Sequence, residues 1–291
     1  MIPARILVVV GSGGVGKTTL AAVLGVAAAK AARDTLVMTF DPSLRLKDAL
    51  GVGEAARDAE VRVPLNAPGA LAVSLLDASG PFDRLVRRYA PDAASRDRIL
   101  SNRLFRHLAG SLAGVLEYMA VGRLGRGAEA FLDRMVGLDL LRDMAEFFQA
   151  FAPLYEGLRT RAEDVHALLR EPETIFVRVN GPAPEHVAET MFFARRLEEA
   201  GHHLGPVVVN RVHPRVEGTN PGLPDDRSEG RQLVAWLGER DRRGVEELRS
   251  LLDASRQPMV IPLLDEQPTN LAVLGGIGKT LLADTGGAHA R

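Results

Sequence analysis

The stretch GSGGVGKTT, residues 11–19, decides which fold this sequence is expected to adopt. It follows the apolar run RILVVV at residues 5–10, which predicts a buried strand, and it leads into an alanine-rich segment at residues 20–32, which predicts a helix. A glycine-rich turn that joins a strand to a helix and ends in Gly-Lys-Thr is typical of a loop that binds the phosphates of a nucleotide. The sequence therefore predicts an α/β protein with a phosphate-binding loop, the P-loop.

Each kind of residue in this loop suits a part of nucleotide chemistry. Its four glycines are expected to let the backbone curl, so that N–H groups converge on a phosphate. The helix that follows directs its positive end toward the same anion. Lys17 is expected to reach the β- and γ-phosphates, and the Thr18 hydroxyl is expected to bind Mg²⁺.

A second stretch, GGIGKT at residues 275–280, repeats the letters of the motif without its context. Val273 stands where the first glycine of a P-loop belongs, and no predicted strand runs directly into the turn. We therefore expect this segment to lie in a C-terminal helix and to serve packing rather than phosphate binding.

Composition narrows the classes of protein that this chain can belong to. The 291 residues include no cysteine, which excludes disulfides and thiolate metal sites. The net charge is −1, and acidic and basic residues are intermingled, so we expect no nucleic-acid partner. No apolar run approaches the ~20 residues of a membrane span, and a strand is predicted from residue 5. We expect neither a signal peptide nor an integral membrane segment, and a cytoplasmic location.

The rest of the chain predicts a mostly parallel sheet covered by helices, with a helical insertion. Six short apolar runs predict strands, and most are separated by helical patterns; they lie at residues 5–10, 35–40, 71–76, 174–180, 206–211 and 258–263. Residues 81–170 contain no convincing strand, and apolar residues there recur at three- and four-residue steps. We therefore expect one P-loop ATPase-like domain over residues 1–291, with a helical insertion at 81–170.

Segments beyond the P-loop resemble the ArsA/GET family, the ATPases of arsenite pumps and of tail-anchored-protein targeting. The stretch DPSLRLKDAL, residues 41–50, resembles that family's Asp-Pro-Ala…Asp-Ala segment. The strand VVVNR at 207–211 is similar to one that ends in an adenine-reading asparagine, and IPL at 261–263 looks like the loop that covers the adenine. The insertion falls where the family carries its client-binding helices.

The resemblance implies an ATP-driven dimer, either a homodimer or a heterodimer with a related ATPase, that binds an apolar helical client. It implies that ATP and Mg²⁺ are the cofactors, that Lys17 and Asp41 are catalytic, and that Thr18 and Asp41 lie at the metal. From the residues alone, Asp41 could instead cap a helix, and Asn210 could be an ordinary turn residue. The residues expected to bind the nucleotide are Gly11, Ser12, Gly13, Gly14, Val15, Gly16, Lys17, Thr18, Thr19, Asn210, Pro262 and Leu263.

Two departures from the family bear on the activity. Ser12 stands where the family often has a lysine that reaches the partner's phosphates across the dimer. The family's apolar strand ending in Asp-Thr has no counterpart, because residues 125–137 continue a helical pattern. That strand would lie beside the first strand. We therefore expect unpaired backbone groups next to the P-loop unless another segment fills in, and no strand within residues 81–170.

These departures leave three functions open. The first is an ATPase of weak activity that couples MgATP binding and hydrolysis to a dimer rearrangement. The second is a nucleotide-binding partner subunit that does not hydrolyse ATP. The third is a client-binding module whose nucleotide site is vestigial. The absence of cysteine argues against a zinc-clasped dimer and against arsenite binding.

Overall fold

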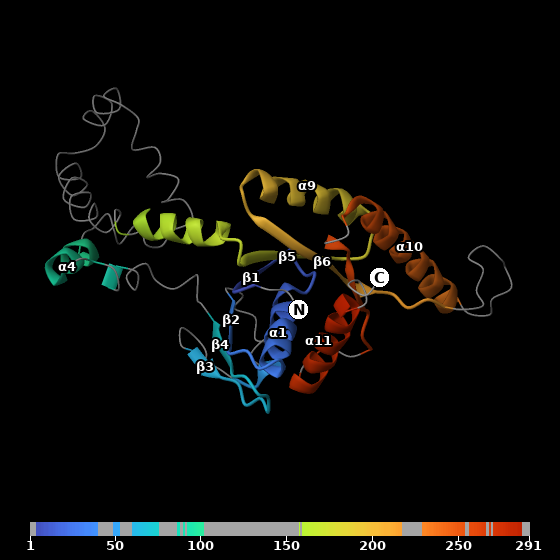
Figure 1. Cartoon of the computed structure of the whole chain (residues 1–291), viewed down its shortest axis with the longest axis horizontal. Coiled ribbons are helices and arrows are strands. Elements are labelled where there is room, and N and C mark those ends of the chain that lie inside the picture. The colour runs from blue at the N-terminus through green and yellow to red at the C-terminus, as the bar shows by residue number, and fades with distance from the viewer. Residues whose placement is uncertain are drawn as a thin grey trace, which may run out of the picture. The chain divides into compact units, whose positions relative to one another are not determined.

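The structure is a computed structural model of the chain (Figure 1), and it describes residues 4–39, 49–52, 60–75, 86–87, 90, 92–101, 157, 159–216, 229–253, 256–265, 268 and 270–286. The chain divides into two compact units. The first consists of Met1–Asp77 and Leu169–Arg291, and the second consists of Ala78–Leu168. In the second unit, α4 (Ala93–Ser101) and residues 159–168 are helical. Because most of the expected insertion at 81–170 lies outside the described residues, its helical character remains a prediction.

The described residues of the first unit form two sheets. The larger one is parallel throughout and has the strand order β1-β5-β6-β7, in which the strands are β1 (Ile6–Val10), β5 (Thr174–Asn180), β6 (His203–Val212) and β7 (Met259–Pro262). The smaller one has the order β2-β4-β3, in which the strands are β2 (Thr35–Thr39), β4 (Leu71–Leu75) and β3 (Glu60–Arg62). β2 and β4 are parallel, and β3 is antiparallel to β4. All six predicted strands are confirmed, and β3 is the strand that the sequence did not predict.

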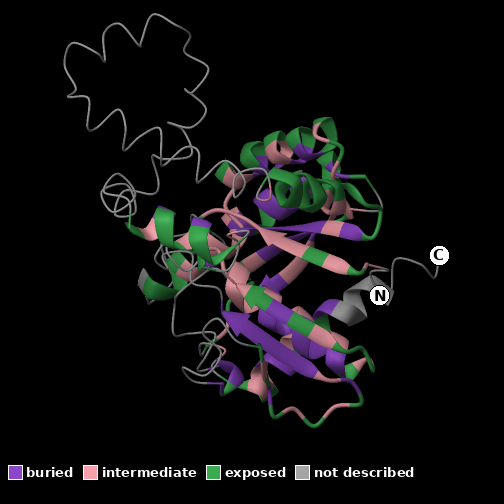
Figure 2. Cartoon of the chain, turned by 90° about the vertical axis from the view of Figure 1, so that its left-hand side faces the viewer, coloured by how far each residue is buried: buried purple, intermediate pink, exposed green. Residues whose placement is uncertain are grey.

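Helices cover both faces of the larger sheet (Figure 1). α1 (Lys17–Lys30) and α11 (Leu271–Gly286) pack on one face, where residues such as Val23 and Leu274 join Val177 of β5 in one core. α9 (Glu185–Glu199) and α10 (Glu229–Leu251) pack on the other face. Buried residues line the inner sides of these layers (Figure 2). No helix in the described part of the chain is both long enough and apolar enough to cross a membrane.

The GGIGKT stretch lies within α11, which confirms that it is part of a packed helix. A Cβ atom added to Gly278 would lie 3.0 Å from the Cβ of Ala27 and 3.3 Å from the carbonyl oxygen of Val23, both on α1. Glycine at this position therefore lets the two helices pack closely.

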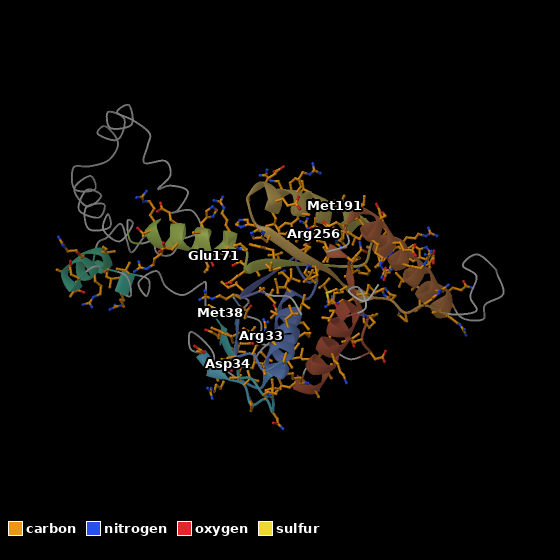
Figure 3. The ribbon with its side chains drawn as sticks, in the orientation of Figure 1. Arg33, Asp34, Met38, Glu171, Met191 and Arg256 are labelled. Carbon is orange, nitrogen blue, oxygen red and sulfur yellow. The ribbon has the colours of Figure 1, made fainter. Side chains whose placement is uncertain are left out.

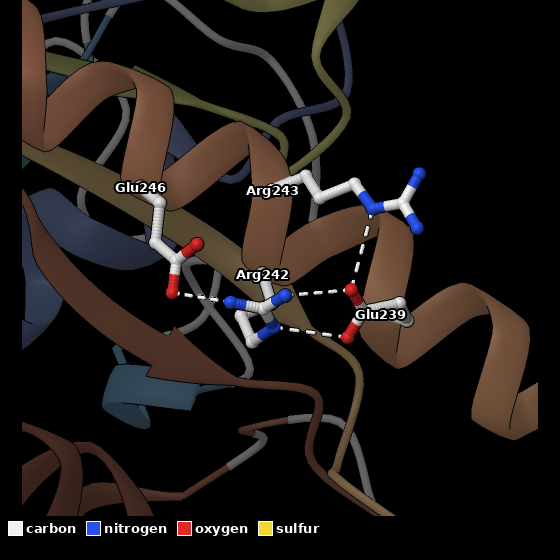
Figure 4. Close-up of polar contacts among 4 residues, drawn as sticks. All are labelled: Glu239, Arg242, Arg243 and Glu246. Carbon is white, nitrogen blue, oxygen red and sulfur yellow. Dashed lines mark hydrogen bonds and ion pairs between the residues drawn. The ribbon is translucent and has the colours of Figure 1, made fainter. Parts of the chain in front are cut away.

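The outer face of α10 is stabilised by ion pairs one helical turn apart (Figure 4). Arg242 pairs with Glu239 at 2.6 Å and with Glu246 at 2.5 Å, and Arg243 also pairs with Glu239. Pairs at this spacing support a helix that is exposed on one side. Hydrogen bonds from Arg242, and then from Arg243, lower the pKa of Glu239 to about 2, although burial acts in the opposite direction.

The two sheets share a core, and no strand pairing joins them among the described residues. The cluster beneath α1 includes Val37 of β2 and Val73 of β4 together with Val177 of β5 and Val208 of β6. In the described part of the chain, β1 pairs only with β5, and β2 pairs only with β4. This agrees with the expectation that the first strand lacks a neighbour. The expectation that no strand occurs within residues 81–170 stays a prediction, because residues 102–156 lie outside those described.

Candidate nucleotide-binding site

The P-loop connects the end of β1 at Val10 to the start of α1 at Lys17. Gly14 and Gly16 have φ angles of 76° and 102°, in the left-handed region that glycine adopts without strain. Gly16 directly precedes α1, and the first turn of this helix contains no acidic residue. The loop therefore leads into a helix N-terminus whose positive end is not neutralised from within its own first turn.

Two glycines of the loop are required by close contacts with neighbouring strands. A Cβ atom at Gly11 would lie 2.2 Å from the carbonyl oxygen of Val179 on β5. A Cβ atom at Gly16 would lie 2.4 Å from Nδ2 of Asn210 on β6. Gly13 differs, because it has no left-handed φ and nothing lies within 4 Å of its added Cβ. The expected role of Gly13 in shaping the loop around a phosphate therefore stays a prediction.

Lys17 bends back over the loop that precedes it. Its Nζ donates a hydrogen bond of 2.7 Å to the carbonyl oxygen of Ser12. This bond spans the turn and places the ammonium group on the loop side of the α1 N-terminus. Thr18 and Thr19 follow in the first turn of α1.

The residues expected at the adenine end come together beside the loop. Asn210 donates from Nδ2 to the carbonyl oxygen of Val15 at 2.8 Å, so its side chain supports the P-loop. Asn210 is in register with Ile261 of β7, and the Leu263 N–H donates to the carbonyl oxygen of Val212 at 2.8 Å. The structure therefore brings Asn210 and the segment containing Pro262 and Leu263 to one end of the sheet. Asp41, the remaining expected site residue, lies outside the described residues.

A buried carboxylate fixes the chain just beyond Asn210. Asp241 of α10 is fully buried and accepts a 3.0 Å hydrogen bond from the His213 N–H. Its Oδ2 also lies 2.6 Å from Nδ1 of His213, and Arg240 pairs with Oδ1 at 3.0 Å. These contacts hold the end of β6 against α10, and with it the backbone that presents Asn210.

Comparison with known proteins agrees with this geometry. Residues 4–96 match the family model of the anion-transporting ATPases, ArsA_ATPase. Over these residues the chain is similar to the ArsA/GET ATPases. The match begins just before β1 and ends within α4, so it includes the P-loop, β2 and β4. No curated protein matches the chain.

Ser12 of the P-loop is hydrogen-bonded within its own chain. Its hydroxyl donates to Oε1 of Glu189 on α9 at 2.6 Å. Arg178 of β5 pairs with the same oxygen at 2.8 Å, and Nδ1 of His186 lies 3.4 Å from the other carboxylate oxygen. The hydrogen bond from Ser12, followed by that from Arg178, lowers the pKa of Glu189 to about 2. The loop position that departs from the family is thus tied to an ionised carboxylate.

Arg178 and Asn180 are buried polar residues of β5 that the sequence did not single out. Arg178 is 4% exposed, and its guanidinium lies 4.9 Å from the ring centre of Phe193 on α9. Asn180 is fully buried at the end of β5, and neither its Oδ1 nor its Nδ2 has a hydrogen-bond partner among the described residues. The signal that could have found them is the polar pair in the otherwise apolar strand TIFVRVN.

Proposed function

We propose that this chain binds MgATP at the P-loop and couples its binding, with slow hydrolysis, to the rearrangement of a dimer that holds a partner or client. The match of residues 4–96 to the family model of the anion-transporting ATPases supports nucleotide binding. The single observation that carries the proposal is the P-loop itself, with Lys17 folded over the loop at an uncapped helix N-terminus. Anions bind readily at such a terminus.

The roles of individual residues extend this proposal. Lys17 contacts the β- and γ-phosphates, and Thr18 and Asp41 bind Mg²⁺, with Asp41 also close to the attacking water. Pro262 and Leu263 cover the adenine, and Asn210 contacts its edge. Because Nδ2 of Asn210 already donates to Val15, the amide oxygen is the atom that is proposed to read the base.

A partner subunit that binds ATP without hydrolysing it is the second candidate function. The Ser12 hydroxyl bonds to Glu189 of its own chain, and serine carries no positive charge to a neighbouring active site. A cation at the γ-phosphate contributes strongly to phosphoryl transfer, so a homodimer of this chain would be a slow catalyst. A related ATPase that supplies such a cation would complete the site, in keeping with a cytoplasmic heterodimer.

The test is nucleotide affinity and turnover of the purified protein, compared between two lysine variants. Lys17→Ala is expected to weaken ATP binding at least tenfold, about 1.4 kcal/mol, because it removes a charge-assisted contact to phosphate. Lys279→Ala removes the exposed lysine of the second GKT sequence, which lies on α11, and is expected to leave ATP affinity unchanged.

The outcomes separate the three functions. ATP binding with turnover supports the ATPase, and binding without turnover supports the partner subunit. If calorimetry gives the same ATP affinity for both variants and the unmodified protein, the P-loop is not the nucleotide-binding site. A protein that binds no ATP at all would have a vestigial site.

A further inference from the structure

We propose that Glu189 is a positioning residue for the P-loop: it ties the start of the loop to α9 and thereby holds Lys17 ready for phosphate. This role rests on the proposed function, since a loop is positioned for a nucleotide only if a nucleotide binds there. Four side chains join the core to the loop in sequence, from Arg178 through Glu189 and Ser12 to Lys17. Glu189 itself lies on α9, 177 positions after Ser12.

The first link begins at Arg178, which is 4% exposed. Arg178 is in register with Val10, the last residue of β1, so it lies beside the point where the P-loop begins. Its guanidinium lies 4.9 Å from the ring centre of Phe193 and pairs with Oε1 of Glu189 at 2.8 Å. Because a buried cation is costly without a counter-charge, this pair determines where the carboxylate of Glu189 lies.

The second link is the carboxylate, which is held at both of its oxygens. Oε1 accepts a 2.6 Å hydrogen bond from the Ser12 hydroxyl, and Oε2 lies 3.4 Å from Nδ1 of His186. The pKa of Glu189 is lowered to about 2, first by the hydrogen bond from Ser12 and then by that from Arg178, so the carboxylate is ionised near neutral pH. Hydrogen bonds to an ionised acceptor are stronger than those between neutral groups. Ser12 therefore has a strong acceptor in a fixed place.

The helix α9 gives this carboxylate a rigid support. Val187 and Met191, two residues before and two residues after Glu189, pack in the core that α9 shares with β6 and α10. Arg256 pairs with Glu198 near the end of the same helix (Figure 3). A group on a helix that is held by packing keeps its position better than a group on a loop. The start of the P-loop is thus tied to a fixed element.

The last link connects Ser12 to Lys17. The carbonyl oxygen of Ser12 accepts a 2.7 Å hydrogen bond from Nζ of Lys17. An ammonium group has three donors, so two of them remain for phosphate oxygens. Since the side chain of Ser12 is bonded to Glu189 and its carbonyl is bonded to Lys17, the tether that fixes the serine also fixes the direction of the lysine. A loop that already has its binding shape loses less conformational freedom when the nucleotide binds.

A carboxylate beside a P-loop could instead weaken nucleotide binding by repelling phosphate. The negative charge of Glu189 is matched by the positive charge of Arg178 at 2.8 Å, so the pair has no net charge and its field falls off quickly with distance. Position is therefore the larger of the two effects. The effects also have opposite signs: truncating Glu189 should tighten nucleotide binding if repulsion dominates and weaken it if positioning does.

The test is the affinity of the folded protein for MgADP by calorimetry, because ADP is not hydrolysed during the titration. Ser12→Ala removes the hydroxyl but keeps the carbonyl and the Glu189–Arg178 pair, and we expect it to weaken binding about tenfold, 1.4 kcal/mol. Glu189→Ala is expected to weaken binding by a similar factor. The double variant should lose about as much as either change alone, because both changes cut the same tether. Glu189→Gln keeps an oxygen that accepts from Ser12 and is expected to restore the affinity to within about threefold of the unmodified protein.

Glu199→Ala is the matched control. Glu199 belongs to the same helix and pairs with Arg196 at 2.9 Å, but it lies ten positions beyond Glu189, about 15 Å along the helix. We expect this variant to bind MgADP like the unmodified protein.

Three results would overturn this role for Glu189: an unchanged affinity in Ser12→Ala, additive losses in the double variant, or tighter binding by both Glu189→Ala and Glu189→Gln. Ser12→Ala decides the question even if Glu189→Ala, which leaves Arg178 without its counter-charge, fails to fold. An unmodified protein that binds neither ATP nor ADP overturns the proposed function together with this role. An unmodified protein that binds both, with Ser12→Ala binding equally well, overturns this role alone.

Discussion

Replacing Asn180 by leucine is expected to make the protein more stable, although the residue lies at the edge of the candidate site. Asn180 is fully buried, and both of its polar side-chain atoms lack hydrogen-bond partners among the described residues. Leaving a buried polar group unsatisfied costs about 1–3 kcal/mol, whereas an apolar group of the same shape carries no such penalty. Leucine has the same branching and the same number of side-chain heavy atoms as asparagine, so the site need not expand.

The expected gain is about 2 kcal/mol in the free energy of unfolding, the middle of that range. In a protein of this size it corresponds to a rise in Tm of roughly 4–8 °C. Urea unfolding should show a higher midpoint with an unchanged slope, since the surface exposed on unfolding stays the same.

Asn210→Leu is the matched control for this experiment. It removes the same amide at the end of the adjacent strand, where Nδ2 donates to the carbonyl oxygen of Val15. Here the expected effect has the opposite sign, a loss of about 1 kcal/mol, because a bond that supports the P-loop disappears. If Asn180→Leu destabilises the protein as much as Asn210→Leu does, the reasoning from unsatisfied atoms is refuted.

Three further predictions concern the P-loop and its carboxylate partner. Gly11→Ala is expected to lower the free energy of unfolding by about 1–3 kcal/mol, because its Cβ would lie 2.2 Å from a β5 carbonyl oxygen. Gly13→Ala is expected to change it by less than about 0.5 kcal/mol in the same denaturation assay; equal effects would contradict the contact argument. Glu189 has a lowered pKa, so its stabilising contribution is complete above about pH 4.5 and is lost as the pH falls toward about 2. The unmodified protein should therefore lose more stability than Glu189→Gln between about pH 6 and pH 3, and identical losses would argue against this pairing. The ATP turnover of the unmodified protein is expected to be below about one per second, and a faster rate would contradict this prediction. Ser12→Lys should raise the turnover more when it is combined with Glu189→Gln, because that change removes the carboxylate that would otherwise pair with the new ammonium group.

The strands of the first unit could be predicted because each is a local apolar run between turn residues. β5 has the predicted bounds, and β1, β2 and β4 differ from theirs by one residue at one end. β3 could not be predicted in this way, because Glu60 and Arg62 give it no apolar character and only its pairing with β4 makes it a strand. The pattern of the P-loop was likewise local, and its position between β1 and α1 is confirmed.

The polar partners of the loop could not be predicted, since they depend on contacts between distant parts of the chain. Glu189 lies on a helix and bonds to Ser12, which is 177 positions earlier in the sequence. The residues next to Gly13 in the sequence do not distinguish it from Gly11. The two differ in the structure, because the carbonyl oxygen of Val179 lies close to Gly11 and nothing lies close to the added Cβ of Gly13. The resemblance to a family indicated that a strand was missing beside the first one. The division into two sheets shows where the gap in the ladder lies.

The uncharged edges of β1 and β2 also bear on how the protein survives in the cell. Newly made copies with bare apolar edges can stack on one another by backbone pairing, the first step toward amyloid-like aggregates. Copies that begin to associate in this way become substrates for chaperones and proteases. Expressing the chain alone should therefore give a large insoluble fraction, recovered as inclusion bodies.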